Sequence, residues 1–286
     1  MLGLKQSLAI GKKRTASGGI VDAPVTDGLI GYWRGGEGIT TDTSGGTTTV
    51  SQWDNIASDR GGEASQTWHM TQSTKADQPT YDATNEVLNW AGGSDKQILT
   101  FDATKIDYNT TWSVVVLLDI SDINNGILFG HASAVQGKMT FYNSQDGGAV
   151  RFQGTSVFYP PHDSSASPLE NANFNIIGQT YAASPSDATG MGYISNQYLF
   201  LASNSAHNNP AINSGNPYFG SPSSKPYSRF GGYGGQSSSF DAMDIKEVMI
   251  FNKQLNQTEV TAIHSYMNGI VTLNVLPDGL DYFGSE

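Results

Sequence analysis

The sequence predicts an all-β fold, a two-sheet antiparallel sandwich with one short C-terminal helix and an extended N-terminal arm. Only 14% of the residues are charged, and Ser, Thr, Asn, Gln and Gly supply the polarity instead. Ser, Thr and Asn compete with the helix backbone for hydrogen bonds, so this composition disfavours long helices. Short runs of β-branched and aromatic residues alternate with Gly/Asn/Ser turns, and one segment alone has a convincing helix pattern.

Strand patterns recur along the chain from Gly28 onward. They cover residues 29–33, 87–90, 98–101, 112–118, 126–130, 139–142, 149–152, 174–178, 190–194 and 198–201. The runs 139–142 and 149–152 flank a turn-rich segment, which is typical of a β-hairpin. Two stretches, 34–80 and 202–239, lack such runs and are longer than ordinary connections. We expect them to be decorated loops or to carry short strands that the pattern does not place.

The C-terminal part of the chain predicts a strand followed by the helix. Residues 244–251 alternate between polar and apolar, with four side chains expected on one face, namely Ile245, Glu247, Met249 and Phe251. Asn256 is the expected N-cap, and Glu259 three residues later completes a capping box. An apolar stripe follows at helical spacing, formed by Val260, Ile263, Tyr266 and Met267. Asn268 and Gly269 mark the end of the helix.

Charge and cysteine content exclude several classes of partner and site. The net charge of −11 and the pI of about 4.7 argue against nucleic acid, which requires clustered Lys and Arg. The chain has no Cys, which excludes disulfides, thiol catalysis and Cys-ligated zinc. The longest apolar runs are far shorter than the roughly 20 residues that span a bilayer. We therefore expect no membrane segment, and the N-terminus shows no signal-peptide pattern.

Residues 1–27 differ from the rest of the chain and predict a separate arm. Four positive charges precede the first acidic residue, Asp22, while the remainder is acidic. We expect either a frayed terminus or an anchoring arm that docks on an acidic or apolar partner. The residues expected to make that contact are Leu2, Leu4, Lys5, Leu8, Lys12, Lys13 and Arg14. The sandwich domain is then expected at 28–271 and a short tail at 272–286, with no internal repeat.

Three parts of the sequence, in this order, match a known domain type. Residues 28–33 (GLIGYW) are followed by 42–45 (DTSG) and 51–54 (SQWD), and then by WHMTQ at 68–72 and QPTY at 78–81. The strand and helix that begin with IKEVMIFNKQL at 245–255 close the domain. Together these segments resemble laminin-G-like, concanavalin A-like jelly-roll domains. The resemblance covers roughly residues 28–271 and implies two curved antiparallel sheets packed face to face.

A second and shorter resemblance concerns the N-terminus. The segment MLGL at 1–4, with Gly and Ser beyond it, resembles the start of bacteriophage structural proteins that carry such domains. This resemblance implies a virion protein, made in the host cytoplasm without a signal peptide and attached to other capsid or tail proteins through residues 1–27. Display on a symmetric shell would also imply a homo-oligomer.

No catalytic constellation is visible in the sequence. Glycoside hydrolysis needs two carboxylates across the scissile bond, and related glucanases carry them as Glu-x-Asp-x-(x)-Glu on one strand, a pattern that is absent here. Asp241, Asp244 and Glu247 are spaced by three, so along a regular strand they would not all face one side. The five His residues are scattered, without a Gly-x-Ser-x-Gly elbow or a His-x-x-x-His pair. We therefore expect no catalytic residues and no enzymatic activity.

Two kinds of binding residue remain as candidates. Asp54 and Asp59 lie in a Gly/Asn-rich region and could hold calcium, although ordinary turn formation is the favoured explanation. No other cofactor is expected. A second group is aromatic and falls in the Gly/Ser-rich stretch, with Tyr218, Phe219, Tyr227, Phe230 and Tyr233 as its members. These could stack on sugars, form a protein interface or pack over the sandwich edge. Four tryptophans in strand-like runs are expected in the core, namely Trp33, Trp53, Trp90 and Trp112.

These observations lead to two hypotheses for the function. The first is a non-enzymatic virion structural protein, either capsid decoration or a tail accessory, that displays the jelly-roll domain and is attached by its arm. The alternative is a carbohydrate-binding module that recognises host surface glycans, with a glycanase as a third and weaker option.

Overall fold

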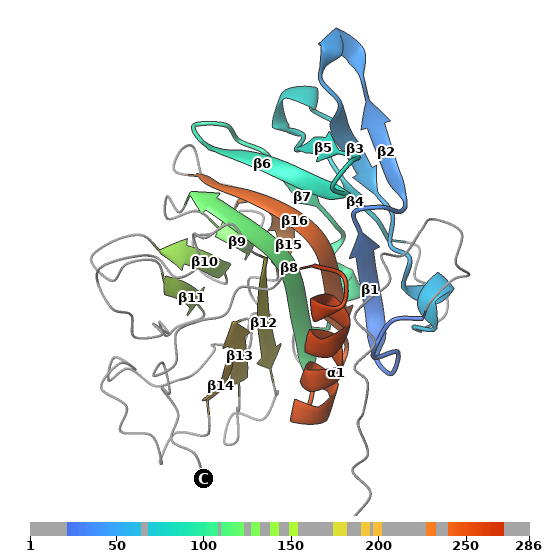
Figure 1. The fold of residues 1–286 in the computed structure, drawn as a ribbon, viewed down its shortest axis with the longest axis vertical. Coiled ribbons are helices and arrows are strands. Elements are labelled where there is room, and N and C mark those ends of the chain that lie inside the picture. The colour runs from blue at the N-terminus through green and yellow to red at the C-terminus, as the bar shows by residue number, and fades with distance from the viewer. Residues whose placement is uncertain are drawn as a thin grey trace, which may run out of the picture.

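The computed structural model shows an all-β protein built mainly of antiparallel strands. It describes residues 22–63, 68–107, 110–122, 127–131, 138–142, 149–153, 174–181, 190–194, 197–201, 227–232 and 240–271. Within these ranges there is one α-helix, α1 (Gln257–Asn268), and it follows the last strand. Figure 1 shows this helix lying against the strands. The predicted fold class is therefore confirmed.

Sixteen strands and four short 3-10 turns make up the described elements besides α1. The strands are β1 (Leu29–Arg34), β2 (Ile39–Asp42), β3 (Thr49–Trp53), β4 (Met70–Thr71), β5 (Thr80–Asp82), β6 (Val87–Gly93), β7 (Leu99–Thr100), β8 (Trp112–Asp122), β9 (Ile127–His131), β10 (Lys138–Tyr142), β11 (Ala149–Gln153), β12 (Asn175–Tyr181), β13 (Gly190–Ile194), β14 (Gln197–Leu201), β15 (Tyr227–Phe230) and β16 (Phe240–Phe251). The 3-10 turns are η1 (Ser44–Gly46), η2 (Ala57–Arg60), η3 (Lys75–Asp77) and η4 (Ala103–Lys105).

The strands form one continuous hydrogen-bonded path that folds over on itself. The path runs β11-β10-β9-β15-β7-β4-β3-β5-β6-β16-β8-β12-β13-β14, with β1 added beside β16 and β2 beside β3. The predicted hairpin of residues 139–142 and 149–152 is confirmed as β10 and β11. Strands from both halves of the path contribute to one apolar core, in which Val116 of β8 and Trp90 of β6 share a cluster with Leu99 of β7 and Phe230 of β15. That shared core makes the path a sandwich of two layers.

Strand β8 as far as Leu118, and the second half of β16 from Glu247 onward, bury both of their faces. On β8, Val114, Val116 and Leu118 point into the main core between the layers. Val115 and Leu117, from the same strand, belong to a second apolar cluster on the opposite face. Because side chains alternate along a strand, a continuous apolar run such as that of β8 is expected where both faces are covered.

The second cluster lies under α1 and under the start of the described chain. Val260, Ile263 and Met267 of α1 are almost fully buried in it. Ala23 and Val25, which the sequence placed in the arm, also pack there, and the Ala23 amide donates to the carbonyl of Arg60 at 3.0 Å. The chain therefore packs against the sandwich a few residues before the expected boundary at Gly28.

The helix itself is formed as the sequence predicted. The side chain of Asn256 accepts a hydrogen bond from the Glu259 amide at 3.1 Å, and the Glu259 carboxylate accepts one from the Asn256 amide at 3.0 Å. This is the predicted capping box, which satisfies two otherwise unpaired donors. No helix in the described ranges is long and apolar enough to cross a membrane.

Strand β16 changes partners half-way along its length. Its first half pairs with β6 and its second half with β1, while β8 runs along its whole other edge. In the pairing with β8 the register shifts between Ile245 and Glu247, so Lys246 is an extra residue, a β-bulge. The bulge reverses the alternation of side chains. Ile245 therefore faces the main core, and its predicted place beside Glu247, Met249 and Phe251 was wrong.

The four predicted core tryptophans are confirmed, since Trp33, Trp53, Trp90 and Trp112 are each at most 2% exposed. The stretch 34–80 carries several short elements, β2 to β5 among them, rather than a bare loop. These strands are only two to five residues long, which is too short for a periodic pattern to stand out. Most of the other unplaced stretch, 202–239, lies outside the described residues.

Where β16 exchanges β6 for β1, the backbone of Gly35 lies so close to two neighbouring carbonyl groups that a larger residue should not fit. A Cβ atom built there would lie 1.9 Å from the carbonyl oxygen of Glu86 and 3.3 Å from that of Lys246, both backbone atoms. We expect Gly35→Ala to lower the free energy of unfolding by at least about 2 kcal/mol, because the backbone must shift. Denaturant unfolding monitored by tryptophan fluorescence measures this loss.

Gly93→Ala is the matched control for that substitution. Gly93 has φ +66°, but nothing lies within 4 Å of a Cβ there, so only the backbone conformation costs energy, roughly 1 kcal/mol. Equal losses for the two variants would show that the close approach at Gly35 does not constrain the fold.

Candidate functional site

A row of polar side chains crosses four neighbouring strands on the face that points away from the main core. Thr80 on β5 pairs with Asn89 on β6, Asn89 pairs with Asp244 on β16, and Asp244 pairs with Asp119 on β8. Paired residues in antiparallel strands share a face, so these four side chains lie side by side. The apolar neighbours Leu88, Ile245 and Leu118 point to the opposite face, into the core. We call these four residues the polar row.

Hydrogen bonds connect three members of the polar row. The Thr80 hydroxyl donates to the Asn89 side-chain oxygen at 3.2 Å. The Asn89 amide nitrogen donates to the Asp244 carboxylate at 2.6 Å. This leaves the Asp119 carboxyl at the end of the row, beside Asp244.

Both carboxyl groups of the row are held in a less hydrated setting than a free surface carboxylate. Partial burial raises the pKa of Asp244, although the hydrogen bond from Asn89 opposes the change. Partial burial and the neighbouring charge of Asp244 raise the pKa of Asp119. Two acids on one face with raised pKa values are a recognised feature of functional sites, although ion-pair networks can produce the same effect.

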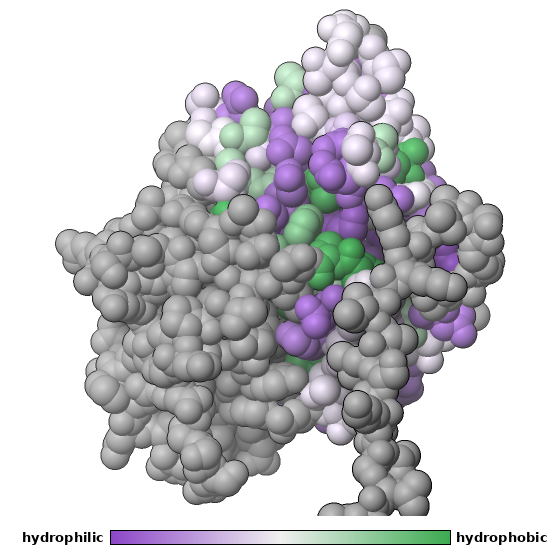
Figure 2. All heavy atoms as spheres, viewed as in Figure 1, coloured by the Kyte–Doolittle hydropathy of each residue, from purple (hydrophilic) through white to green (hydrophobic). Residues whose placement is uncertain are grey.

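Small side chains lie next to the polar row. Ala91 and Ala242 pair with each other across β6 and β16, two positions along each strand from Asn89 and Asp244. Ala91 is exposed and Ala242 is half-buried. Because each side chain is a single methyl group, neither projects far above the strands. Figure 2 shows hydrophilic residues gathered over β6 and β16 on this face. An open surface with hydrogen-bonding groups beside it is therefore accessible from solvent.

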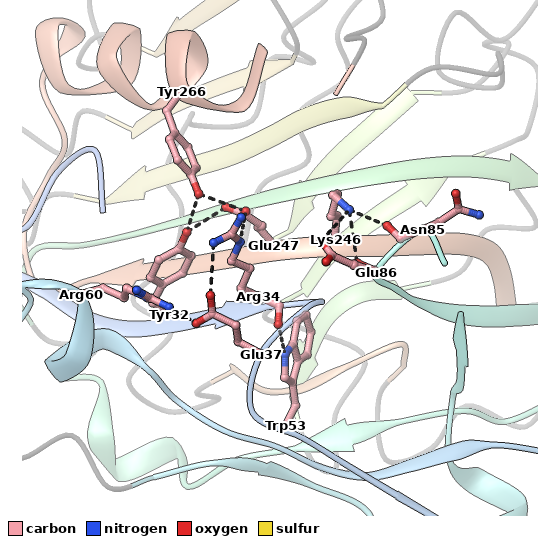
Figure 3. Close-up of polar contacts among 10 residues, drawn as sticks. All are labelled: Tyr32, Arg34, Glu37, Trp53, Arg60, Asn85, Glu86, Lys246, Glu247 and Tyr266. Carbon is pink, nitrogen blue, oxygen red and sulfur yellow. Dashed lines mark hydrogen bonds and ion pairs between the residues drawn. The ribbon is translucent and has the colours of Figure 1, made fainter. Parts of the chain in front are cut away.

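A second polar cluster lies further along β16, where α1 covers the same face. Glu247 is fully buried, and its carboxylate accepts hydrogen bonds from the Tyr32 hydroxyl at 3.0 Å and the Tyr266 hydroxyl at 3.2 Å. The Arg34 side-chain nitrogen Nε lies 3.2 Å from the same carboxylate. The two tyrosine hydroxyls are 2.9 Å apart. Figure 3 shows these groups converging on Glu247 from β1, β16 and α1.

Burial of this cluster raises the pKa values of Glu247 and of both tyrosines. Burial raises the pKa of Glu247 to about 7, although Arg34 and the two tyrosine hydroxyls favour its ionised form. Burial and the charge of Glu247 raise the pKa of Tyr266 to about 12 and raise that of Tyr32 further. Both tyrosines therefore stay protonated and can donate to the carboxylate at neutral pH.

Arginine side chains extend this cluster away from Glu247. Arg34 also pairs with Glu37 at 3.2 Å, and Arg60 pairs with the other oxygen of Glu37. Two glutamates and two arginines thus alternate from the buried Glu247 through the partly exposed Glu37 to Arg60, which is itself buried. A buried charge held by hydrogen bonds and an ion pair fixes geometry more than it adds stability. We read this cluster as the support that positions α1 and β1 on β16.

The bulge also corrects the sequence argument about these carboxylates. A spacing of three predicted that Asp244 and Glu247 would face opposite sides of a regular strand. Because Lys246 is an extra residue, Asp244 and Glu247 both lie on the face away from the main core. Asp244 is half-buried in the open part of that face, whereas Glu247 is closed off beneath α1.

The predicted calcium residues do not come together. Asp54 accepts a hydrogen bond from the Gln52 side chain at 2.7 Å and lies 3.2 Å from His69 Nδ1. Asp59 is exposed on η2. Within the described part of the chain, no three His, Asp or Glu side chains gather to hold a metal ion.

Among the predicted binding aromatics, the side chain of Phe230 can be placed, and of its three predicted roles packing fits best. Its side chain is 1% exposed and stacks on Phe129 with ring centroids 4.5 Å apart, so it belongs to the main core. Tyr227 begins β15, while Tyr218, Phe219 and Tyr233 lie outside the described residues. The expected contact residues of the arm, from Leu2 to Arg14, also lie outside them.

Sequence reasoning missed most of the polar row. Asn89 stands between Leu88 and Trp90, and Asp119 between Leu118 and Ile120, so each reads as one polar residue inside a strand. Such positions mark the non-core face of each strand. The pairing that aligns them is set by contacts between residues far apart in the chain, as for Asn89 and Asp244, and the sequence does not show it.

Comparisons with known proteins place the fold but not the activity. No protein-family model matches the chain, and no curated protein matches it in sequence. Solved structures of Trypanosoma rangeli sialidase resemble it. One, in complex with a difluoro-KDN compound, covers 92% of this chain at a TM-score of 0.53 and 12% identity. Another covers 86% at a TM-score of 0.51 and 14% identity.

These matches concern part of the sialidase chain. The matched region is 37% of the first sialidase chain and 34% of the second, so this chain spans about a third of their length. Identity this low shows the fold alone. A β-sandwich is consistent with the concanavalin A-like resemblance of the sequence, while the laminin-G and bacteriophage resemblances gain nothing from these matches.

The expectation of no enzymatic activity is contradicted by the same matches. It rested on the absence of a catalytic constellation in the sequence, yet the sialidase structures matched here, over about a third of their own length, are structures of enzymes, so a missing motif does not exclude a glycosidase fold. The structure further weakens that expectation, because the bulge in β16 and the pairing with β8 bring carboxyl groups together that no sequence motif revealed.

The polar row predicts a pH-dependent response to an added carboxylate. Asn89→Asp removes the amide that donates to Asp244 and places like charges in register across β6, β16 and β8. At pH 7 we expect a loss of about 1 kcal/mol or more in the free energy of unfolding. The loss should shrink toward pH 3, where the three carboxyls are protonated. Urea unfolding at both pH values measures it.

A loss of the same size at pH 3 and pH 7 would contradict the account, since it would mean that charge at the polar row contributes nothing to the effect.

Proposed function

We propose that this chain is a carbohydrate-binding β-sandwich domain whose contact surface is the polar row with Ala91 and Ala242. The observation that carries the proposal is the in-register alignment of hydroxyl, amide and carboxyl groups on an open sheet face. Sugars present rings of hydroxyls that both donate and accept hydrogen bonds. The polar row offers both kinds of group at spacings set by neighbouring strands, about 5 Å.

Two further observations support this proposal. The alanines beside the row leave room for a flat ring to approach the strands closely. The solved structures that share the fold include a sialidase in complex with sialic acid. The fold has thus been found in proteins that handle carbohydrates, which agrees with the alternative hypothesis drawn from the sequence.

A second candidate function, glycoside hydrolysis, is favoured by the neighbouring carboxyls of Asp119 and Asp244. Retaining and inverting glycosidases use a pair of carboxyl groups, one protonated as the acid and one ionised. Asp244 is hydrogen-bonded by Asn89, which favours its ionised form. Burial and the charge of Asp244 raise the pKa of Asp119, and burial also raises the pKa of Asp244 despite the hydrogen bond from Asn89. In this candidate function Asp119 would be the proton donor and Asp244 the second carboxyl group.

The virion role stays a prediction from the sequence alone. The same holds for attachment through residues 1–27, for the homo-oligomer and for synthesis in a host cytoplasm. Glycan recognition would be compatible with any of them.

Removal of one amide tests the binding proposal. We expect the wild-type protein to bind a subset of a glycan array, and Asn89→Ala to bind the same glycans at least about tenfold more weakly by calorimetry. That loss corresponds to one or two hydrogen bonds. Asn252→Ala is the matched control, because the Asn252 amide is exposed and donates instead to Glu63 at 2.9 Å. Wild-type affinity in Asn89→Ala, or an array without any bound glycan, would overturn the proposal.

The same glycans separate binding from hydrolysis. If the chain is a glycosidase, prolonged incubation of wild type with a bound glycan should release new reducing ends. Asp119→Asn should then abolish release while retaining binding, because it removes the proton donor and little volume. Release that survives Asp119→Asn would exclude this carboxyl as the acid.

A further inference from the structure

Two elements, β1 and α1, enclose Glu247, and they are held to β16 by different kinds of contact. On one side, β1 is fixed to β16 by a backbone ladder, in which Arg34 pairs directly with Glu247. On the other side, α1 packs against the strands and contacts them through its side chains. Tyr266, near the C-terminal end of α1, reaches the Glu247 carboxylate, and Met267 packs beside it in the second core. Water can therefore reach Glu247 most readily when this end of α1 lifts.

We propose that the C-terminal turn of α1 is a pH-responsive latch, closed by Tyr266 over Glu247 and loosened when the buried carboxyl ionises. The claim concerns the fold and is independent of glycan binding. The proposal is based on the hydrogen bonds and the ion pair that side chains of β1 and α1 make with one fully buried acid of β16, Glu247 (Figure 3). Loosening would expose part of the second core, including Met267, to solvent.

Every charged or titratable group that faces the carboxyl has a defined effect on it. From β1, Arg34 and the Tyr32 hydroxyl favour the ionised form. From α1, the Tyr266 hydroxyl does the same, and on β16 the neighbouring Lys246 adds a weaker attraction. Leu117, the partner of Glu247 on β8, carries no charge. Loss of hydration outweighs all four, and the pKa of Glu247 is raised to about 7.

The direction of the pH effect follows from that shift. An acid whose pKa is higher in the closed state than in water binds its proton more tightly when the latch is closed. The contribution of Glu247 to closure is therefore largest below its ordinary pKa of 4.5 and weakens as the pH rises toward 7. Above pH 7 the acid is ionised in both states, and the effect levels off.

His264 is a separate titratable group on α1 and acts in the opposite direction. Burial lowers its pKa, and its Nε2 atom is buried without a hydrogen-bond partner. Protonation of His264 would thus loosen α1 at acidic pH. The two effects are separable, since ionisation of Glu247 acts as the pH rises and protonation of His264 acts as it falls.

Hydrogen–deuterium exchange of the full-length protein tests the latch. Protection factors, corrected for the intrinsic rate at each pH, are compared for residues 263–271 between pH 6 and pH 8. We expect a decrease of up to about tenfold in wild type, which is the change that a shift of this size produces across that interval. The strand residues 114–118 of β8 should keep their protection and serve as the internal reference.

Three variants, with a fourth in reserve, make the result specific. Glu247→Gln keeps a side chain that can hydrogen-bond to both tyrosines but does not ionise, so the decrease should disappear. Glu63→Gln, at an exposed carboxylate, and His264→Gln should both leave it in place. If Glu247→Gln fails to fold, Tyr266→Phe supplies the test, because it should lower protection of the same turn at pH 6. A wild-type protection that does not change from pH 6 to pH 8, or a decrease that persists in Glu247→Gln, would overturn the proposal.

Discussion

One extra residue in β16 determines where the polar side chains of this protein lie. At Lys246 the strand exchanges β6 for β1 on one edge, and the bulge reverses the alternation of its side chains. Without it, the apolar residues Val248 and Ile250 would leave the main core, because a shift of one residue turns every side chain to the other face. The exchange also requires close backbone approach, and Gly35 provides the space beside Glu86.

The bulge has two chemical consequences along one face of the sheet. On one side of Lys246, Asp244 joins Asn89 and Asp119 in an open row, where water can still reach the carboxyl groups. On the other side, Glu247 is closed off by β1 and α1 and depends on Tyr32, Tyr266 and Arg34 for its hydrogen bonds. The first setting suits contact with an external ligand, whereas the second links elements of the fold and, through the raised pKa of Glu247, makes their contact sensitive to pH.

Local patterns in the sequence predicted what depends on local chemistry. The capping box of Asn256 and Glu259 is an interaction over three residues, so it was visible as a motif. The apolar run of β8 likewise predicted a buried strand. The polar row could not be predicted, because Asn89 and Asp244 are 155 residues apart and meet only through strand pairing. Burial of Phe230 in the main core could not be predicted for the same reason, since an aromatic residue in a Gly/Ser-rich stretch gives no sign of the Phe129 ring that buries it.

The central claim is that the open half of the β16 face, positioned by the bulge, contacts the ligand. The side-chain amide of Asn89 reports on this directly, because it already donates to Asp244 within the row. In a 15N-labelled sample titrated with a bound glycan, we expect the Asn89 side-chain NH2 resonances to shift. Those of Asn55, which is buried and donates to the carbonyl of Ile30, should stay in place. Saturating glycan with an unchanged Asn89 amide would contradict the account.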